Sequence, residues 1–144
     1  MTDTDREVEA LIEAARAILA SRYRPDRHYV GAALSTRSGQ VFSAVNLGAT
    51  VGRASVCAEA VALGMAAAAG DTSVDLIVAV NERGAVVSPC GLCRENLSDF
   101  APTARVVVPE GEGLVVVTIA ALLPNKFAKD DRGAASRRSN LRKL

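Results

Sequence analysis

The three cysteines constrain the fold of this 144-residue chain more than any other feature of its sequence. Cys57 stands alone, whereas Cys90 and Cys93 form a Cys-x-x-Cys pair. Cys57 and Cys90 each come at the start of a segment with a helical pattern. If all three thiolates bind one metal ion, two helix N-termini face each other across that ion. The positive end of each helix dipole would then favour the thiolate form.

The spacing of the cysteines leaves several uses open. A Cys-x-x-Cys pair serves metal sites and redox dithiols alike, but a redox pair has no need of a third thiol far upstream. An odd count without a secretory signal argues against a disulfide framework. Three protein ligands leave one position of a tetrahedral zinc open, which is typical of a catalytic site. A structural zinc and unrelated buried thiols are the alternatives.

Glu59 lies two residues after Cys57, on the first turn of the same predicted helix. Its carboxylate could reach the open position and move protons there, with its pKa raised by partial burial. Zinc lowers the pKa of a bound water and so supplies a nucleophile at neutral pH. A Cys-x-Glu ahead of Pro-Cys-x-x-Cys is the signature of zinc deaminases, which replace an exocyclic amine by hydroxyl.

The apolar pattern predicts an α/β fold. Residues 5–23 have the apolar spacing of a helix, and two short strands, 29–36 and 40–48, flank a turn. Further segments follow in the order helix, strand, helix and strand, over residues 57–70, 74–87, 90–100 and 104–124. This order predicts a layered sheet with helices on its faces. The last segment ends in an apolar run towards Pro124, for which the pattern gives neither helix nor strand.

Composition and charge predict one domain without an obvious macromolecular partner. Hydrophobic residues make up 49% of the chain but aromatic ones only 3%, so the core must consist of small aliphatic residues. The net charge of +1 gives no general attraction to nucleic acid or lipid. The acidic N-terminus and the short apolar runs indicate neither a signal peptide nor a membrane span. We expect a soluble, cytoplasmic protein.

Residues 129–144 change to small, polar and then basic sequence. We therefore expect a single domain over residues 1–128, followed by a flexible basic tail. The alternative is a basic arm that touches nucleic acid or a partner subunit.

Several motifs of the chain resemble the cytidine deaminase family, in its small homotetrameric branch. The motifs are "YVGAAL", "SGQVFSAVN", "CAE", "SPCGLCR" and "LLPNKF", and they lie within residues 25–127. Their combination is more specific than any one of them. The resemblance implies a three-layer α/β/α fold with a mixed central sheet, one Zn²⁺ per subunit and a homotetramer. It also implies a cytosine nucleoside as substrate, as in pyrimidine salvage.

The resemblance further implies roles for individual residues. Cys57, Cys90 and Cys93 would bind zinc, and Glu59 would be the catalytic proton shuttle. Four residues would bind substrate: Asn46 at the sugar, Ala58 through backbone groups at the amide edge of the base, Phe127 by packing on the base in a neighbouring subunit, and His28 in the pocket. Asn46 could instead cap the turn after the hairpin, and Phe127 could be a core anchor.

Three departures from the family pattern bear on the substrate. Gly48 stands where the family usually has a Glu that binds a ribose hydroxyl, Ala60 where an Arg helps to balance the thiolates, and His28 where an aromatic ring is common. The segments "CAEAVALGMAAAAG" and "SPCGLCRENLSDF" resemble the blasticidin S deaminases, which act on a cytosine nucleoside antibiotic. Cytidine, deoxycytidine and a modified cytosine nucleoside of the blasticidin type are therefore the candidate substrates.

The charge of the site leaves further alternatives open. Three thiolates on Zn²⁺ sum to −1, which weakens Lewis acidity. Arg53 and Arg94 could offset part of this charge, or they could be ordinary solvated arginines. A nucleic-acid editor that uses the basic tail is a second function, although the low net charge argues against it. A non-catalytic zinc-binding or ligand-binding module is a third, but it would have no need of Glu59.

Overall fold

The computed structural model describes residues 1–128, so the predicted tail, 129–144, lies outside the described residues. The elements follow in this order: α1 (Asp3–Arg22), β1 (Val30–Thr36), β2 (Val41–Val45), the short 3-10 helix η1 (Gly52–Ala54), α2 (Ala58–Ala68), β3 (Val74–Asn81), β4 (Val86–Val87), α3 (Gly91–Phe100), β5 (Arg105–Glu110), β6 (Gly113–Thr118) and α4 (Ile119–Leu122). Within residues 1–128, no helix has both the length and the apolar character that crossing a bilayer requires.

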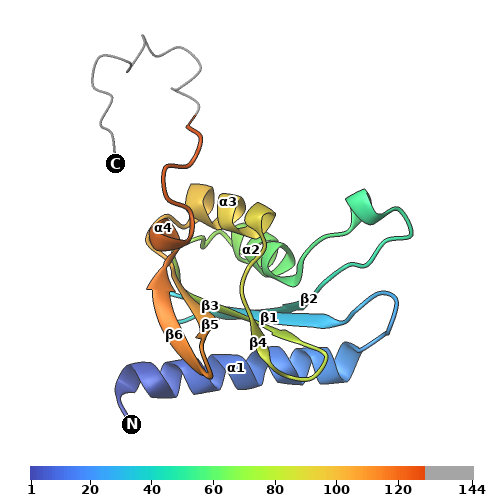
Figure 1. Ribbon diagram of the computed structural model, residues 1–144, viewed down its shortest axis with the longest axis horizontal. Helices are drawn as coiled ribbons and strands as arrows, with labels where there is room; N and C mark the ends of the chain where they lie inside the picture. Colours follow the sequence, from blue (N-terminus) through green and yellow to red (C-terminus); the bar gives the residue numbers. More distant parts are fainter. Residues whose placement is uncertain (129–144) are drawn as a thin grey trace.

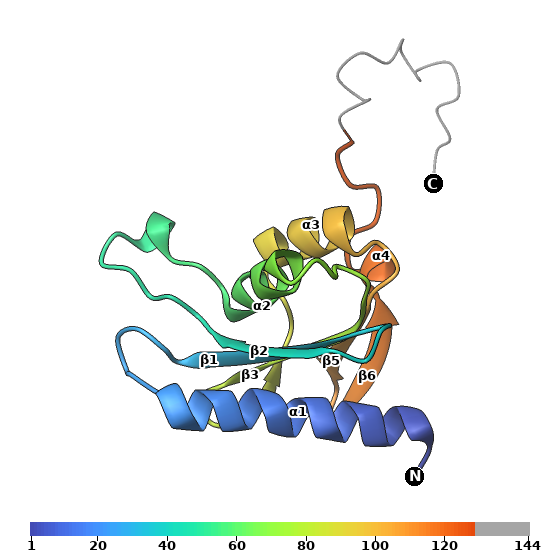
Figure 2. The same cartoon turned by 180° about the vertical axis from the view of Figure 1, so that it is seen from behind.

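One six-stranded sheet forms the centre of the structure, with the strand order β2-β1-β3-β5-β6 and with β4 paired to β3. The pairing of β3 with β5 is parallel and the other pairings are antiparallel, so the sheet is mixed. Helix α1 covers one face, and α2 and α3 cover the other, as Figure 1 and Figure 2 show. The predicted three-layer α/β/α fold is confirmed.

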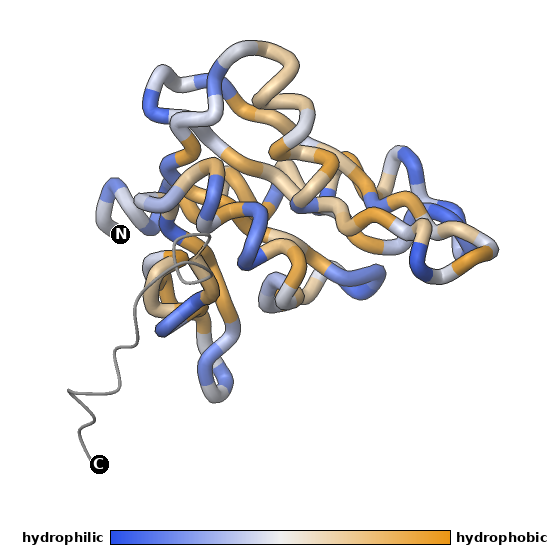
Figure 3. The backbone as a smooth tube through the Cα atoms, turned by 90° about the horizontal axis from the view of Figure 1, so that it is seen from above, coloured by the Kyte–Doolittle hydropathy of each residue, from blue (hydrophilic) through white to orange (hydrophobic). Residues whose placement is uncertain are grey.

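Alternation along the strands gives the sheet a packed core on each of its faces. In β3, Leu76 packs in the cluster that contains Leu11 of α1, whereas the next residue, Ile77, packs with Leu63 of α2 and Leu97 of α3. Successive strand residues point to opposite faces, so a strand covered on both faces reads as a continuous apolar run. Figure 3 shows apolar colouring along the central strands, while hydrophilic colouring gathers in the turns.

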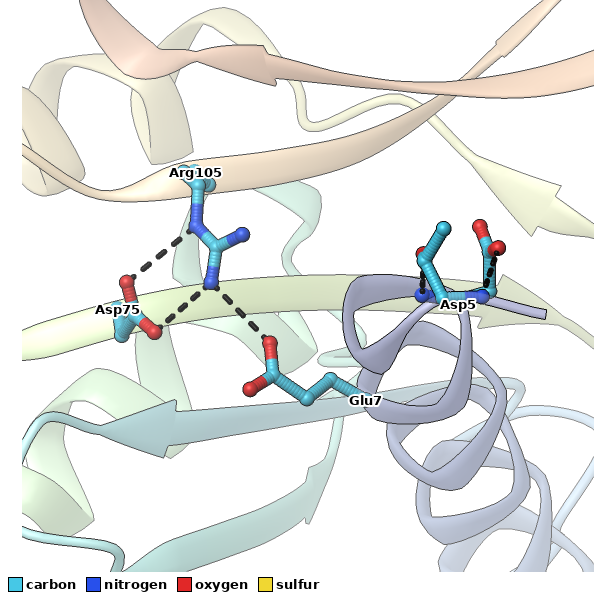
Figure 4. Close-up of polar contacts among 5 residues, drawn as sticks. Asp5, Glu7, Asp75 and Arg105 are labelled. Atoms are coloured by element: carbon cyan, nitrogen blue, oxygen red, sulfur yellow. Dashed lines mark hydrogen bonds and ion pairs between the residues drawn. The ribbon is translucent and has the colours of Figure 1, made fainter.

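Polar contacts fix the first half of α1 to the sheet. The helix begins with a capping box, in which the Thr2 hydroxyl accepts from the Asp5 amide at 3.1 Å and the Asp5 carboxylate accepts from the Thr2 amide at 2.8 Å. Arg105 of β5 pairs with Asp75 of β3 at 2.8 Å and with Glu7 of α1 at 3.3 Å (Figure 4). One guanidinium group therefore links a helix and two strands.

Gly31 of β1 lies directly against α1. A Cβ atom at this position would overlap the carbonyl oxygen of Ala15 and would approach the Cβ atom of Leu19 to 2.9 Å. Close packing of the helix on the strand therefore requires glycine here.

The apolar run after the β5 strand resolves into strand β6 and the short helix α4, which the sequence pattern did not separate. Strand β6 pairs antiparallel with β5, and the Thr118 hydroxyl caps α4 by accepting from the Ala121 amide at 3.2 Å. A short apolar run without polar alternation fits a strand or a buried helix, so periodicity alone could not place this boundary.

The connection from β2 to α2, residues 47–56, projects beyond the sheet in Figure 1 and Figure 2, and we call it the arm. Its two ends are joined by a bridge between Leu47 and Val56, whose backbone amides donate to each other's carbonyl oxygens at 2.8 and 3.0 Å. The arm therefore returns to the body of the protein immediately before Cys57.

Candidate active site

The three cysteines converge at the N-termini of two helices. Cys57 is the N-cap residue of α2 and Cys90 is the N-cap residue of α3, while Cys93 lies in the first turn of α3. The three sulfur atoms lie within 4.8 Å of one another, and those of Cys57 and Cys90 are 3.5 Å apart. A tetrahedral zinc with Zn–S bonds of about 2.3 Å spaces its sulfurs by about 3.8 Å. The donor set and its spacing therefore fit one zinc ion.

Burial and local hydrogen bonds act in opposite directions on the thiols. Burial raises the pKa of Cys57 and of Cys93 above the ordinary thiol value. Burial also acts on Cys90, but the Cys93 backbone amide and the Cys57 thiol donate hydrogen bonds to its sulfur, and its pKa is lowered. The positive ends of α2 and α3 meet at these sulfurs and favour the thiolate form that binds metal.

Glu59 lies in the first turn of α2 and is only 7% exposed. Burial raises the pKa of its carboxyl group, and hydrogen bonds from its own backbone amide and from the Cys93 thiol offset part of that effect. The contact with Cys93 places the carboxyl group beside the sulfur cluster. A buried carboxyl group in this position can accept a proton from a bound molecule and can return a proton to it.

A cavity of about 210 Å³ opens beside the sulfurs. The buried residues Ala58 and Glu59 mark its floor, whereas the more exposed Tyr29 and Val56 mark its rim. Among the described residues that line it, Glu59 carries the only carboxylate. The cavity therefore leads from solvent to a single proton-transfer group beside the three sulfurs.

Asn46 links the cavity wall to the start of β1. Its side-chain oxygen Oδ1 accepts hydrogen bonds from the backbone amides of Tyr29 at 2.7 Å and Val30 at 2.9 Å. Its Nδ2 group has no hydrogen-bond partner within residues 1–128, and Asn46 lines the cavity. Asn46 thus fixes the neighbouring backbone, and its Nδ2 group remains as a hydrogen-bond donor on a residue of the cavity wall.

Of the other predicted substrate-binding residues, Ala58 lies in the cavity wall, whereas His28 and Phe127 do not line it. The His28 Nδ1 atom lies 2.7 Å from the carbonyl oxygen of Asn46, so its contact with the site is indirect. Phe127 is 62% exposed. A core anchor is excluded from solvent, so that alternative for Phe127 is wrong.

The two arginines near the cysteines do not contact the sulfurs. Arg94 donates from Nε to the carbonyl oxygen of Pro89 at 2.9 Å and from Nη1 to that of Leu122 at 3.0 Å. It is therefore part-buried and ties the residue before Cys90 to α4, rather than being a solvated side chain. Arg53 is exposed in η1 of the arm. The groups of positive character that lie at the sulfurs are the N-termini of α2 and α3.

Sequence reasoning did not select Tyr29, Ser55, Val56 or Val87, which also line the cavity. They come from the start of β1, the arm and β4, which are far apart in the sequence. No residue type or spacing marks such wall positions, because they are brought together only by the packing of loops.

Comparisons with known proteins agree with this geometry. The family described as the cytidine and deoxycytidylate deaminase zinc-binding region matches residues 5–110. The chain is similar to a blasticidin-S deaminase from Bacillus cereus, with 41% identity over 128 residues that cover 83% of this chain and 91% of the relative. It is also similar to a cytidine deaminase from Sporosarcina psychrophila, with 30% identity over 133 residues that cover 90% of this chain and 98% of that protein.

Solved structures give the same result for the fold. The crystal structure of a cytidine deaminase from Burkholderia pseudomallei matches with a TM-score of 0.72 and 36% sequence identity. The match covers 88% of this chain and 100% of that one.

Proposed function

Because the chain belongs to the family of cytidine and deoxycytidylate deaminases, we propose that it is a hydrolase that removes the exocyclic amine of a cytosine nucleoside as ammonia. The observation that carries this proposal is the place of Glu59, a buried carboxyl group beside three sulfurs on the floor of a cavity. A structural zinc site or a purely binding module has no need of a proton-transfer group there.

The residues Cys57, Cys90 and Cys93 would hold the zinc ion, and three sulfurs leave the fourth tetrahedral position open to substrate chemistry. Zinc, when bound, supplies a nucleophile by lowering the pKa of water. The N-termini of α2 and α3 offset the charge of the thiolates, since neither nearby arginine contacts a sulfur in the described structure.

Glu59 would move both protons that the reaction requires. As oxygen from water forms a bond to carbon 4 of the base, the carboxylate takes the proton of that water and delivers it to ring nitrogen 3. A second proton then passes through the same carboxyl group to the amine. The bond from carbon 4 to the amine breaks, and ammonia leaves with a uracil nucleoside as the other product.

Ala58 and Asn46 would orient the substrate. Ala58 is the first residue of α2, where backbone N–H groups have no partner within the helix, and it lies on the cavity floor beside Glu59. Its backbone would therefore meet the amide edge of the base. Asn46 would use its Nδ2 group on the sugar.

The identity of the sugar separates two candidate substrate types. Similarity to a cytidine deaminase favours cytidine or deoxycytidine, and the higher similarity to a blasticidin-S deaminase favours a cytosine nucleoside of the antibiotic type. The second is also favoured by Gly48, which brings no side chain to the region where the resembling family places a ribose-binding carboxylate.

A substrate panel tests the proposal. Zinc-loaded protein is incubated with cytidine, deoxycytidine, cytosine and blasticidin S, and loss of the cytosine chromophore is followed by ultraviolet absorbance. Glu59→Gln protein purified in parallel measures any contaminating deaminase. We expect turnover of at least one nucleoside well above that control. Absence of turnover with every cytosine compound would rule out the proposed activity.

We further propose a homotetramer in which Phe127 packs against the base in a neighbouring subunit. Its support is the exposure of apolar side chains along α3 and beyond it, with Phe100 58% exposed and Leu92 74% exposed. Phe127 does not line the cavity of its own chain, which is compatible with a place in the cavity of a neighbouring subunit. Light scattering would give the mass, and a monomer would contradict this assembly.

We also propose that the deaminase domain spans residues 1–128 and that the protein works in the cytoplasm. Three free thiols at metal-binding distance are best kept reduced, and disulfides rarely persist in that compartment. Fractionation of cells that express the protein would test the location.

A further inference from the structure

The cavity has a direction that orients any cytosine nucleoside bound in it. Glu59, at the floor, is 7% exposed, and Tyr29, at the rim, is 39% exposed. In cytosine, the carbon that bears the amine and the nitrogen that bears the sugar are on opposite sides of the ring. A base with its amine at Glu59 therefore directs its sugar towards the rim, where Tyr29 lies together with Val56. This step rests on the proposed function.

The ring of Tyr29 lies against Gly48, and only glycine fits at that place. A Cβ atom on residue 48 would lie 2.8 Å from the carbonyl oxygen of Asp26 and 3.1 Å from Cε1 of Tyr29. Two hydrogen bonds between Gly48 and Arg27 hold Gly48 in this place. The Gly48 amide donates to the Arg27 carbonyl at 2.7 Å, and Arg27 Nη1 donates to the Gly48 carbonyl at 2.9 Å. Any side chain at position 48 would displace the turn or the tyrosine ring.

The backbone of Tyr29 is also fixed, because its amide donates to Asn46 Oδ1 at 2.7 Å. Its phenol hydroxyl has no hydrogen-bond partner among residues 1–128. Tyr29 is therefore an aromatic residue of the cavity rim whose backbone is held by a hydrogen bond and whose ring lies against Gly48.

This wall differs chemically from one that would recognise ribose through its hydroxyl pair. A carboxylate can accept hydrogen bonds from two adjacent hydroxyls, but a sugar without them leaves its charge unpaired. Sites built around such bonds reject the analogue that lacks the hydroxyl by about 10⁴- to 10⁵-fold. A neutral aromatic ring packs on the carbon–hydrogen face of a sugar and leaves no charge unpaired when hydroxyls are missing.

We propose that Tyr29 is the specificity-determining residue for the sugar. Its ring, seated on Gly48, forms the sugar-side wall and admits cytosine nucleosides that lack the adjacent hydroxyl pair of ribose.

The test compares kcat/KM for cytidine, 2′,3′-dideoxycytidine and the sugar-free 1-methylcytosine, the last as substrate or as competitive inhibitor. The proteins are the wild type, Tyr29→Ala, Tyr29→Phe and the control Tyr23→Ala, which removes a tyrosine of similar exposure whose hydroxyl donates to Glu82 instead. We expect the wild type to favour cytidine over dideoxycytidine by less than about tenfold, since the sugar would meet the Tyr29 ring and the neutral Asn46 amide, and no charge depends on the hydroxyls.

We expect Tyr29→Ala to lower kcat/KM for both nucleosides by about tenfold or more beyond any change that it causes for 1-methylcytosine. Tyr29→Phe, which keeps the ring, should stay within about threefold of the wild type, and Tyr23→Ala should leave the three ratios unchanged. An equal loss on the nucleosides and on 1-methylcytosine would overturn the inference, because Tyr29 would then act on the base or on the fold.

The wild-type ratio needs no variant, so the inference stays testable if Tyr29→Ala does not fold. A preference for cytidine over dideoxycytidine of 10³-fold or more would overturn it while leaving the deaminase function in place. Lack of turnover with every cytosine compound is the separate result that removes the proposed function and this inference with it.

Discussion

The sulfur atoms of Cys57 and Cys90 lie 3.5 Å apart, although the two residues are 33 positions apart in the chain. Each residue is the N-cap of a different helix, so the folding of two helices against one sheet brings the pair together. The sulfur of Cys93 lies within 4.8 Å of both, so the three sulfurs could hold one zinc ion. The Glu59 carboxyl group lies beside them, in contact with Cys93.

Cys90→Ala should lose most of its bound zinc, whereas the wild type should hold about one ion per chain. The substitution leaves two of three protein ligands and removes the sulfur that receives backbone hydrogen bonds within α3. Metal analysis of the purified proteins measures the difference. A variant that retained a full equivalent of zinc would show that the ion binds elsewhere.

Glu59→Gln should keep the zinc and the fold but lose about 10²- to 10⁴-fold in kcat, because the amide cannot take up and pass on a proton. Steady-state kinetics on the best nucleoside of the panel, with metal analysis and circular dichroism, separate the two effects. Glu112→Gln, in the exposed turn between β5 and β6, is the matched control. Near-normal kcat in Glu59→Gln would mean that another group moves the protons.

Gly31→Ala should destabilise the protein by about 1–3 kcal/mol, because the new methyl group would meet the Ala15 carbonyl and the Leu19 side chain. Gly64→Ala is the matched control, since Gly64 lies in the interior of α2 with nothing within 4 Å of a Cβ atom. It should stabilise by about 0.5–1 kcal/mol. Urea denaturation measures both, and equal effects of the two variants would contradict the packing described for α1.

Asp71→Asn should destabilise the protein near neutral pH, and the difference from the wild type should shrink in acid. The Asp71 carboxylate accepts from the Ser38 hydroxyl at 2.6 Å, the Gln40 side chain at 3.2 Å and the Ser73 amide at 3.1 Å, which joins the β1–β2 turn to the start of β3. The bond from Ser38 contributes most to lowering its pKa below the ordinary value of 3.8.

Because the folded-state pKa of Asp71 is the lower one, its stabilising contribution is present above pH 3.8 and is lost as the pH falls through the folded-state value. Denaturation midpoints of both proteins between pH 6 and pH 3 measure the trend. A difference that grows in acid would mean that Asp71 is not the stabilising anion described here.

The pattern of the sequence predicted the fold and the centre of the site because both depend on local signals. Helix periodicity placed α1, α2 and α3, and the same helix starts carried Cys57 and Cys90. Strand β6 and helix α4 were not separated, because an apolar run without polar alternation fits both. The role of Arg94 was also missed, since its partner Leu122 lies on a distant helix.

The walls of the cavity could not be predicted for a related reason. The sequence marks Gly48 as a departure from a family pattern, but not that the Asp26 carbonyl and the Tyr29 ring occupy the space around it. Contacts of this kind depend on how two loops pack, which neither residue type nor spacing reveals. The sequence therefore predicts the type of reaction better than it predicts the substrate.

Release of ammonia when zinc is returned to the stripped protein tests the proposed zinc-dependent deamination most directly. Protein stripped by a chelator is supplied with one equivalent of Zn²⁺ and the best nucleoside of the panel, and ammonia is measured against nucleoside consumed. We expect one ammonia per nucleoside, with activity regained only on addition of zinc and absent from Glu59→Gln. Equal activity in the stripped protein, or consumption of nucleoside without ammonia, would contradict a zinc-dependent hydrolytic deaminase.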